Sequence, residues 1–75
     1  MDELFIVMES RYYHSDVTGL PHVRVDGKFE TEEMAYKHIA EKTKNCEYHK
    51  DSDGVLMFSL SPKYESEFCV RKVKF

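Results

Sequence analysis

One segment of this chain has the pattern of an amphipathic helix, and segments patterned for strands lie on both sides of it. The helix is predicted from Thr31 to about Lys44. The Thr31 hydroxyl can cap the first turn, and the two acids that follow lie at the positive end of the helix dipole. An inward stripe is expected at a spacing of four residues, formed by Ala35, Ile39 and Thr43.

Two strands are predicted before the helix. Residues 3–13 carry apolar side chains on both faces, with Leu4, Ile6 and Met8 on one face and Phe5 and Val7 on the other, which is typical of a central strand. Residues 22–29 alternate apolar and polar side chains. Gly27 interrupts their apolar face and indicates a bulge or a close approach of the helix.

The segment after the helix is predicted to hold a turn and two further strands. Residues 47–54 are interpreted as a turn because they contain Asp51-Ser52-Asp53-Gly54. A short strand follows at 55–60, with Leu56, Phe58 and Leu60 on one face. The apolar residues of the last strand, 67–75, change face near Arg71, which predicts a bulge there.

These elements predict a single α+β domain over residues 1–75. The expected fold is a small antiparallel sheet, in the element order ββαββ, with one helix packed across one face.

Composition limits the setting of the chain. The longest apolar run, residues 4–8, is far shorter than the roughly 20 residues of a membrane-spanning helix, so no membrane association is expected. Two cysteines are too few for the disulfide framework usual in small secreted domains, which predicts free thiols and a cytoplasmic location, with one disulfide left open. The net charge of −3 is that of neither a strongly basic nor a strongly acidic protein.

Catalytic motifs are missing from the sequence. It contains no nucleophile elbow, no phosphate-binding glycine loop and no His-Glu-x-x-His motif, so we expect no enzyme activity and no cofactor. Cys69 is predicted to be a buried, inert residue of the last strand. Cys46 and His49 have the spacing of two zinc ligands, but a second close pair is missing, and a metal site is therefore a weak alternative.

The feature least explained by folding is a cluster of aromatic and basic residues in the first two strands. If these strands pair as a hairpin, the cluster gathers near its open end. Alternation places Tyr12 in the core and Tyr13 at the surface. Aromatic rings beside guanidinium groups anchor protein partners or stack on bases. The predicted binding residues are Arg11, Tyr13, His14, His22 and Arg24.

The end of the chain carries three positive charges, on Arg71, Lys72 and Lys74. Charged side chains of this kind protect an edge strand from aggregation. They could also contact phosphates, in which case the sheet face opposite the helix would bind single-stranded nucleic acid.

The segment from Val25 to Ala35 resembles a strand-to-helix junction in short phage and bacterial proteins of unknown function. In these proteins the strand ends in an aromatic residue, followed by Ser or Thr, acids and an Ala. The first strand, with Glu9 and Tyr12 before an irregular loop, is also similar. The resemblance implies a small accessory protein of a phage or mobile element that acts by binding, and it implies no catalytic residue.

The leading hypothesis is therefore a non-enzymatic interaction module that binds a larger protein, with inhibition of that protein as one outcome. Single-stranded nucleic-acid binding is the second hypothesis, and metal binding through Cys46 and His49 is the third.

Overall fold

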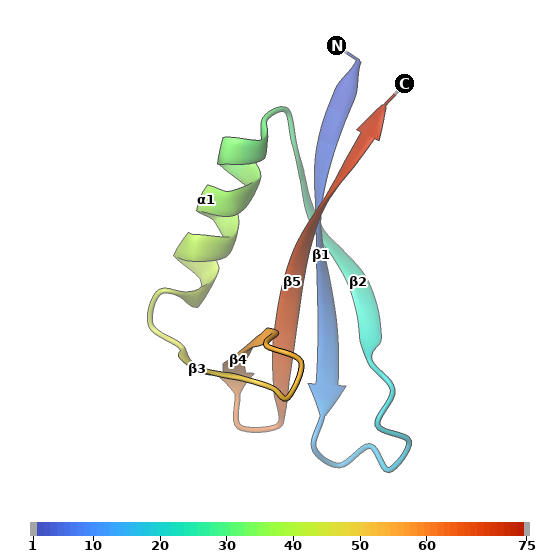
Figure 1. The fold of residues 1–75 in the computed structure, drawn as a ribbon, viewed down its shortest axis with the longest axis vertical. Coiled ribbons are helices and arrows are strands. Elements are labelled where there is room, and N and C mark those ends of the chain that lie inside the picture. Colours follow the sequence, from blue (N-terminus) through green and yellow to red (C-terminus); the bar gives the residue numbers. More distant parts are fainter. Residues whose placement is uncertain (1, 75) are drawn as a thin grey trace.

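The chain folds into one five-stranded antiparallel sheet and one helix in a computed structural model that describes residues 2–74 (Figure 1). The strands lie side by side in the order β2-β1-β5-β4-β3. The α+β class and the antiparallel sheet agree with the prediction, but the element order is ββαβββ. The elements are β1 (Glu3–Tyr13), β2 (His22–Phe29), α1 (Glu32–Thr43), β3 (Glu47–Lys50), β4 (Leu56–Ser61) and β5 (Tyr64–Lys74).

The long strand β1 lies in the interior of the sheet, between β2 and β5. It pairs with β5 over its whole length, from Glu3 opposite Lys74 to Tyr13 opposite Tyr64. No register shift interrupts this pairing within the described residues, so the bulge predicted near Arg71 was wrong. Phe68 and Val70 lie on one face of β5 and Val73 lies on the other, without a bulge between them. Phe75, the predicted end of this strand, lies outside the described residues.

A bulge occurs instead in β2, next to the glycine that indicated it. Val7 lies opposite Gly27 and Met8 opposite Val25, so Asp26 is the extra residue. A Cβ atom at Gly27 would lie 2.7 Å from Cε2 of Phe29. The Phe29 ring therefore lies against the backbone of Gly27 and would have to shift to admit a larger residue there.

The segment predicted as a turn at 47–54 contains the short strand β3. Its residues pair with β4, from Glu47 opposite Ser59 to Lys50 opposite Leu56. The turn itself is confined to residues 51–55, where the Asp51 carboxylate accepts from the amides of Asp53 and Val55 at 2.8 and 3.0 Å. All four residues of β3 are exposed, so the strand has none of the apolar alternation that identifies strands in a sequence.

The helix has the predicted cap and inward stripe. Thr31 Oγ1 accepts from the amide of Met34 at 3.2 Å, and Ala35 and Thr43 are buried while Ile39 is half-buried. In β4, Met57 is buried, Phe58 and Leu60 are half-buried and Leu56 is exposed.

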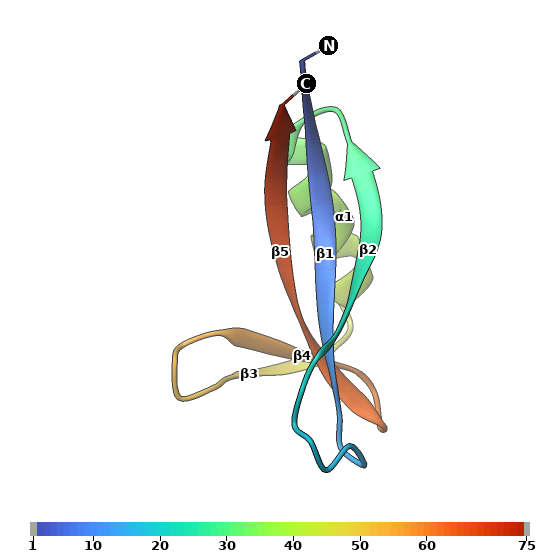
Figure 2. The ribbon, with the colours of Figure 1, turned by 90° about the vertical axis from the view of Figure 1, so that its right-hand side faces the viewer.

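The sheet has two unlike faces. The covered face lies under α1 and includes Phe5, Val7, Glu9, Arg11 and Tyr13 of β1. The open face, toward the viewer in Figure 2 with α1 behind the strands, includes Leu4, Ile6, Met8, Ser10 and Tyr12.

Cys69 lies opposite Met8 on the open face and is exposed, so its predicted burial was wrong. No described segment of the protein packs over that part of the sheet. A cysteine that sequence alternation places among apolar neighbours is therefore accessible to solvent.

Candidate functional site

A buried carboxylate lies at the centre of the covered face. Glu9 has no exposed surface. Its Oε2 accepts from Arg11 Nε at 2.7 Å and from Ser66 Oγ at 2.6 Å. Its Oε1 has no hydrogen-bond partner among the described residues, and Arg24 Nε and Lys42 Nζ each lie 3.9 Å from it. A buried charge is tolerated only when it is paired with opposite charges. The Glu9 carboxylate accordingly lies beside the cationic groups of Arg11, Arg24 and Lys42.

A second acid fastens the helix to the sheet. Asp26 on the β2 bulge is only 5% exposed and binds Lys42 Nζ at 2.6 Å and His38 Nε2 at 2.8 Å. Burial by itself raises the pKa of Asp26, but the hydrogen bonds from Lys42 and His38 outweigh it and lower this pKa below its usual value. The bulge thus turns a carboxylate toward α1.

Arg11 links this ionic network to an aromatic group at the end of β1. Its guanidinium lies 4.3 Å from the centre of the Tyr64 ring, and its Nη1 donates to the Tyr13 hydroxyl at 3.3 Å. The hydrogen bond to Glu9, followed by the one to Tyr13, raises the pKa of Arg11 above its already high value. The arginine is held in one position by groups on both sides.

The aromatic end cluster consists of Arg11, Tyr13, His22 and Tyr64. The Tyr13 ring meets His22 edge to face at 5.2 Å and Tyr64 at 5.1 Å between ring centres. Three of the five predicted binding residues are therefore brought together, at the end of the hairpin that its loop closes and not at its open end. Tyr12 and Tyr13 are both half-buried, which corrects the expected division into a core and a surface tyrosine.

The β1–β2 loop, residues 14–21, extends from this cluster and is held by hydrogen bonds of its own. Asp16 accepts from the amide of Thr18 at 2.9 Å and from its hydroxyl at 2.6 Å, and it also meets His22 Nε2 at 3.1 Å. The Thr18 hydroxyl oxygen accepts in turn from the amide of Leu20. These bonds lower the pKa of Asp16, chiefly through Thr18.

This braced loop carries its apolar side chains outward. Val17 is 100% exposed and Leu20 is 66% exposed. The hydrogen bonds of the loop are local, so they set its shape without burying either side chain. Sequence reasoning missed both residues, and the available signal was two apolar residues within a segment otherwise made of turn formers.

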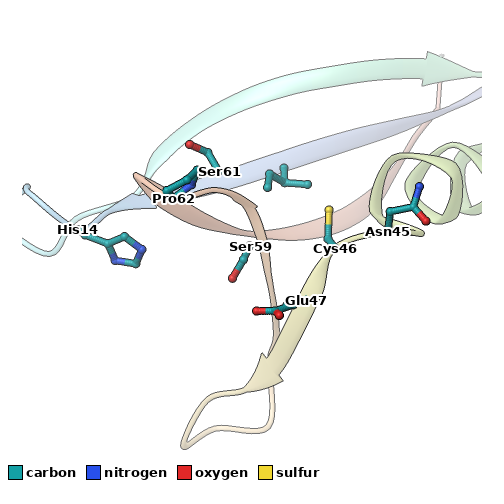
Figure 3. A pocket seen from close by; sticks show the side chains of 8 residues that line it. His14, Asn45, Cys46, Glu47, Ser59, Ser61 and Pro62 are labelled. Carbon is teal, nitrogen blue, oxygen red and sulfur yellow. The ribbon is translucent and has the colours of Figure 1, made fainter.

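The two remaining residues of the predicted site lie elsewhere. Arg24 faces Glu9 in the ionic network, where its own side chain is 53% exposed. His14 follows β1, and its backbone amide donates to the carbonyl of Lys63 at 3.0 Å. Its side chain points into a neighbouring hollow between the end of α1 and the β3–β4 hairpin (Figure 3).

That hollow has a volume of about 450 Å³. Within residues 2–74, no side chain that lines it hydrogen-bonds to another of its side chains, so it holds no paired nucleophile and base. The Cys46 thiol instead donates to the carbonyl of Lys42 at 3.9 Å. The lining residues are His14, Asn45, Cys46, Glu47, Ser59, Leu60, Ser61 and Pro62.

The predicted metal pair is not assembled into a larger donor set. Cys46 contacts the end of α1, while His49 Nδ1 lies 3.7 Å from a carboxylate oxygen of Glu65. Among residues 2–74, no three His, Cys, Asp or Glu side chains are grouped to hold an ion.

The basic residues near the end of β5 are divided between the faces of the sheet. Arg71 lies on the open face, whereas Lys72 and Lys74 lie on the covered face, where Lys72 Nζ is 3.7 Å from Glu3. The three charges thus form no single patch.

Comparison with protein-family models, with curated proteins and with solved structures found no match in any of the three. In the described part of the chain, no helix is long and apolar enough to cross a bilayer.

Proposed function

We propose that this chain is a non-enzymatic module that binds a larger protein through the β1–β2 loop and the aromatic end cluster. The observation that carries the proposal is the pair Val17 and Leu20, which stand outside the core on a loop braced by Asp16 and Thr18. A partner that covers exposed apolar side chains removes their surface from water, which favours binding.

The surface beside the loop has the composition of an interaction hot spot. Tyrosine and arginine dominate the binding energy of protein interfaces because they present a large area with little conformational freedom. Arg11 is held by Glu9 and Tyr64 before any partner arrives. Pre-ordering of this kind reduces the entropy lost on association.

Nucleic-acid binding is less well supported by the arrangement of charge. Among the described residues, Tyr12 is the one aromatic side chain that β1, β2 and β5 place on the open face, and Arg71 is separated there from Lys72 and Lys74. A single-strand groove combines a run of positive charge with several stacking rings.

The resemblance to short phage and bacterial proteins supports the same class of function. An accessory protein of a phage or mobile element that inhibits or redirects a host protein would need a rigid contact surface and no catalytic group. Inhibition is part of the proposal, and so is a cytoplasmic site of action.

The test compares proteins captured from a cell lysate by the wild type and by matched variants, with quantitative mass spectrometry. We expect one protein to be retained by the wild type and by Tyr36→Ser, which removes an exposed aromatic ring from α1. Val17→Asp and Tyr13→Ala should each lose that protein. Melting temperatures near that of the wild type would show that both variants fold.

The salt dependence of binding separates the two classes of partner. Binding through apolar and aromatic contacts should change little between low and moderate salt. Nucleic acid as the captured ligand, with affinity falling steeply as salt rises, would contradict the proposal. Retention of the same protein by Val17→Asp and Tyr13→Ala would also contradict it.

A further inference from the structure

The open face of the sheet is a second apolar surface, separate from the loop. Val23 and Val25 of β2 are 57% and 50% exposed there, and Val73 of β5 is 36% exposed. Between them lie the half-buried Leu4, Ile6 and Met8 of β1. No described residue of α1 covers this surface, since α1 packs on the opposite side (Figures 1 and 2).

Charges on this face are separated along the strands. At the level of Ile6, the neighbours across the sheet are Arg71 on β5 and Lys28 on β2. At the level of Ser10, the neighbour on β5 is Glu67. The positive charges therefore lie on one side of the level of Met8, and a carboxylate lies on the other side.

Cys69 lies halfway between Arg71 and Glu67 on β5, opposite Met8. Glu67 is half-buried and accepts from the Tyr12 hydroxyl at 3.2 Å. Arg71 is exposed, and none of the ion pairs formed within residues 2–74 includes it. The arginine is thus available for a carboxylate of another molecule.

We propose that the open face binds a second copy of this chain about a two-fold axis that crosses the strands at the level of Met8 and Cys69. Such an axis turns one sheet over onto the other with the strands reversed, so β5 lies over β5 of the second copy. Arg71 of each copy then faces Glu67 of the other, and Val25, Met8 and Cys69 meet their counterparts between these two reciprocal pairs. An isologous contact requires this self-complementarity.

Charge selects this axis over the other two-fold arrangement that stacks the same faces. An axis parallel to the strands would place each residue opposite residues at the same height along the strands of the second copy. It would also place β5 of one copy over β2 of the other. Arg71 would then meet Lys28, since both lie beside Ile6. Like charges across an interface oppose association.

The size of the face predicts a weak dimer. Three strands about 4.8 Å apart and seven residues with a rise of about 3.3 Å make a surface of roughly 15 by 23 Å. The total area that two such surfaces would bury lies near the lower limit for a specific interface, even when the uneven shape of the side chains is included. We therefore expect association that depends on concentration in the micromolar range.

Sedimentation velocity from about 1 µM to about 1 mM tests the association. The mass should rise from one chain toward two. Val25→Glu, which adds a charge at an exposed position, should weaken association at least tenfold, with an unchanged circular dichroism spectrum. A protein that stays monomeric throughout this range, or that binds a different protein on this face instead, overturns the proposal.

A charge exchange tests the geometry. Arg71→Glu alone and Glu67→Arg alone should each weaken association at least tenfold, while the double variant should restore most of it. Lys72→Glu, at the adjacent position on the covered face, should have no such effect. Failure of the double variant to recover, with both single variants folded, would overturn the arrangement.

Cross-linking provides a measurement that does not depend on altered charges. In a Cys46→Ser background, a short bismaleimide should join Cys69 to Cys69 of the second copy, because both lie on the axis. A matched control moves the thiol to the covered face through Cys69→Ser and Lys72→Cys. Equal dimer yield from the two proteins would indicate random collision and would contradict the proposal.

Discussion

The two faces of the sheet differ in how they combine polar and apolar groups. The covered face buries Glu9, Asp26 and Ser66 beneath α1, whereas the open face leaves Val23 and Val25 half-exposed to solvent. In most small domains the apolar face of a sheet lies under the helix. This chain uses part of its limited interior for ion pairs.

The difference indicates what each face is for. Ionic contacts are directional, and we infer that Lys42 and Arg11 fix the positions of α1 and of the aromatic end cluster. On the open face, we propose that Arg71 and Glu67 set the orientation of a second copy, while the exposed valines supply area for contact. The ionic contacts of the covered face act within one chain, and those proposed for the open face would act between chains.

The largest expected effect comes from breaking the ionic network. Glu9→Ala removes the acceptor of Arg11 and Ser66 and leaves three cations without their shared carboxylate. We expect a loss of about 3–5 kcal/mol in the free energy of unfolding, measured with urea. Glu9→Gln, which keeps the shape and an acceptor oxygen, should lose less. A loss below about 1 kcal/mol for Glu9→Ala would show that the covered face is held by packing alone.

The apolar part of the covered face should respond to a smaller change. Val7 is fully buried, and Val7→Thr keeps the shape of the side chain but places a hydroxyl where solvent cannot reach it. We expect a loss of about 1–3 kcal/mol in the free energy of unfolding. An unchanged stability in urea would mean that water enters between α1 and the sheet.

Local patterns predicted the elements but not the contents of the covered face. The Thr31 cap, the stripe through Ala35 and the interior position of β1 in the sheet depend on residues near one another in the sequence. The contact between Glu9 and Ser66 joins residues 57 apart. It depends on the β1–β5 register, which no local signal sets.

The candidate site shows the same limit. Arg11, Tyr13 and His22 were predicted because aromatic and basic residues cluster in the first two strands. Tyr64 completes the cluster through β5, and the sequence places it beside an unremarkable turn. The short strand β3 was missed for a different reason, since a fully exposed edge strand carries no apolar pattern.

Acid should weaken the covered face through Asp26. The pKa of Asp26 is lowered in the folded protein, so the unfolded chain binds more protons in acid and is favoured there. The contribution of Asp26 is present at neutral pH and is lost as the pH falls below about 4. Free energies of unfolding measured between about pH 6 and pH 2.5 should fall less for Asp26→Asn than for the wild type.

A second acid provides the control for this pH dependence. Asp16 also has a lowered pKa, but it lies in the β1–β2 loop away from α1. Asp16→Asn should change the slope with pH less than Asp26→Asn does. A larger change for Asp16→Asn would place the acid-sensitive contact in the loop and not under the helix.

The smallest expected effect is on the open face and uses the same substitution as on the covered one. Val25→Thr keeps a β-branched side chain in β2 and adds a hydroxyl that water can reach, because Val25 is 50% exposed. At protein concentrations low enough to keep the chain monomeric, the free energy of unfolding should change by less than about 0.5 kcal/mol. A loss equal to that of Val7→Thr would mean that the open face is already covered within a single chain. The contrast between the two faces would then fail, and so would the surface proposed for the second copy.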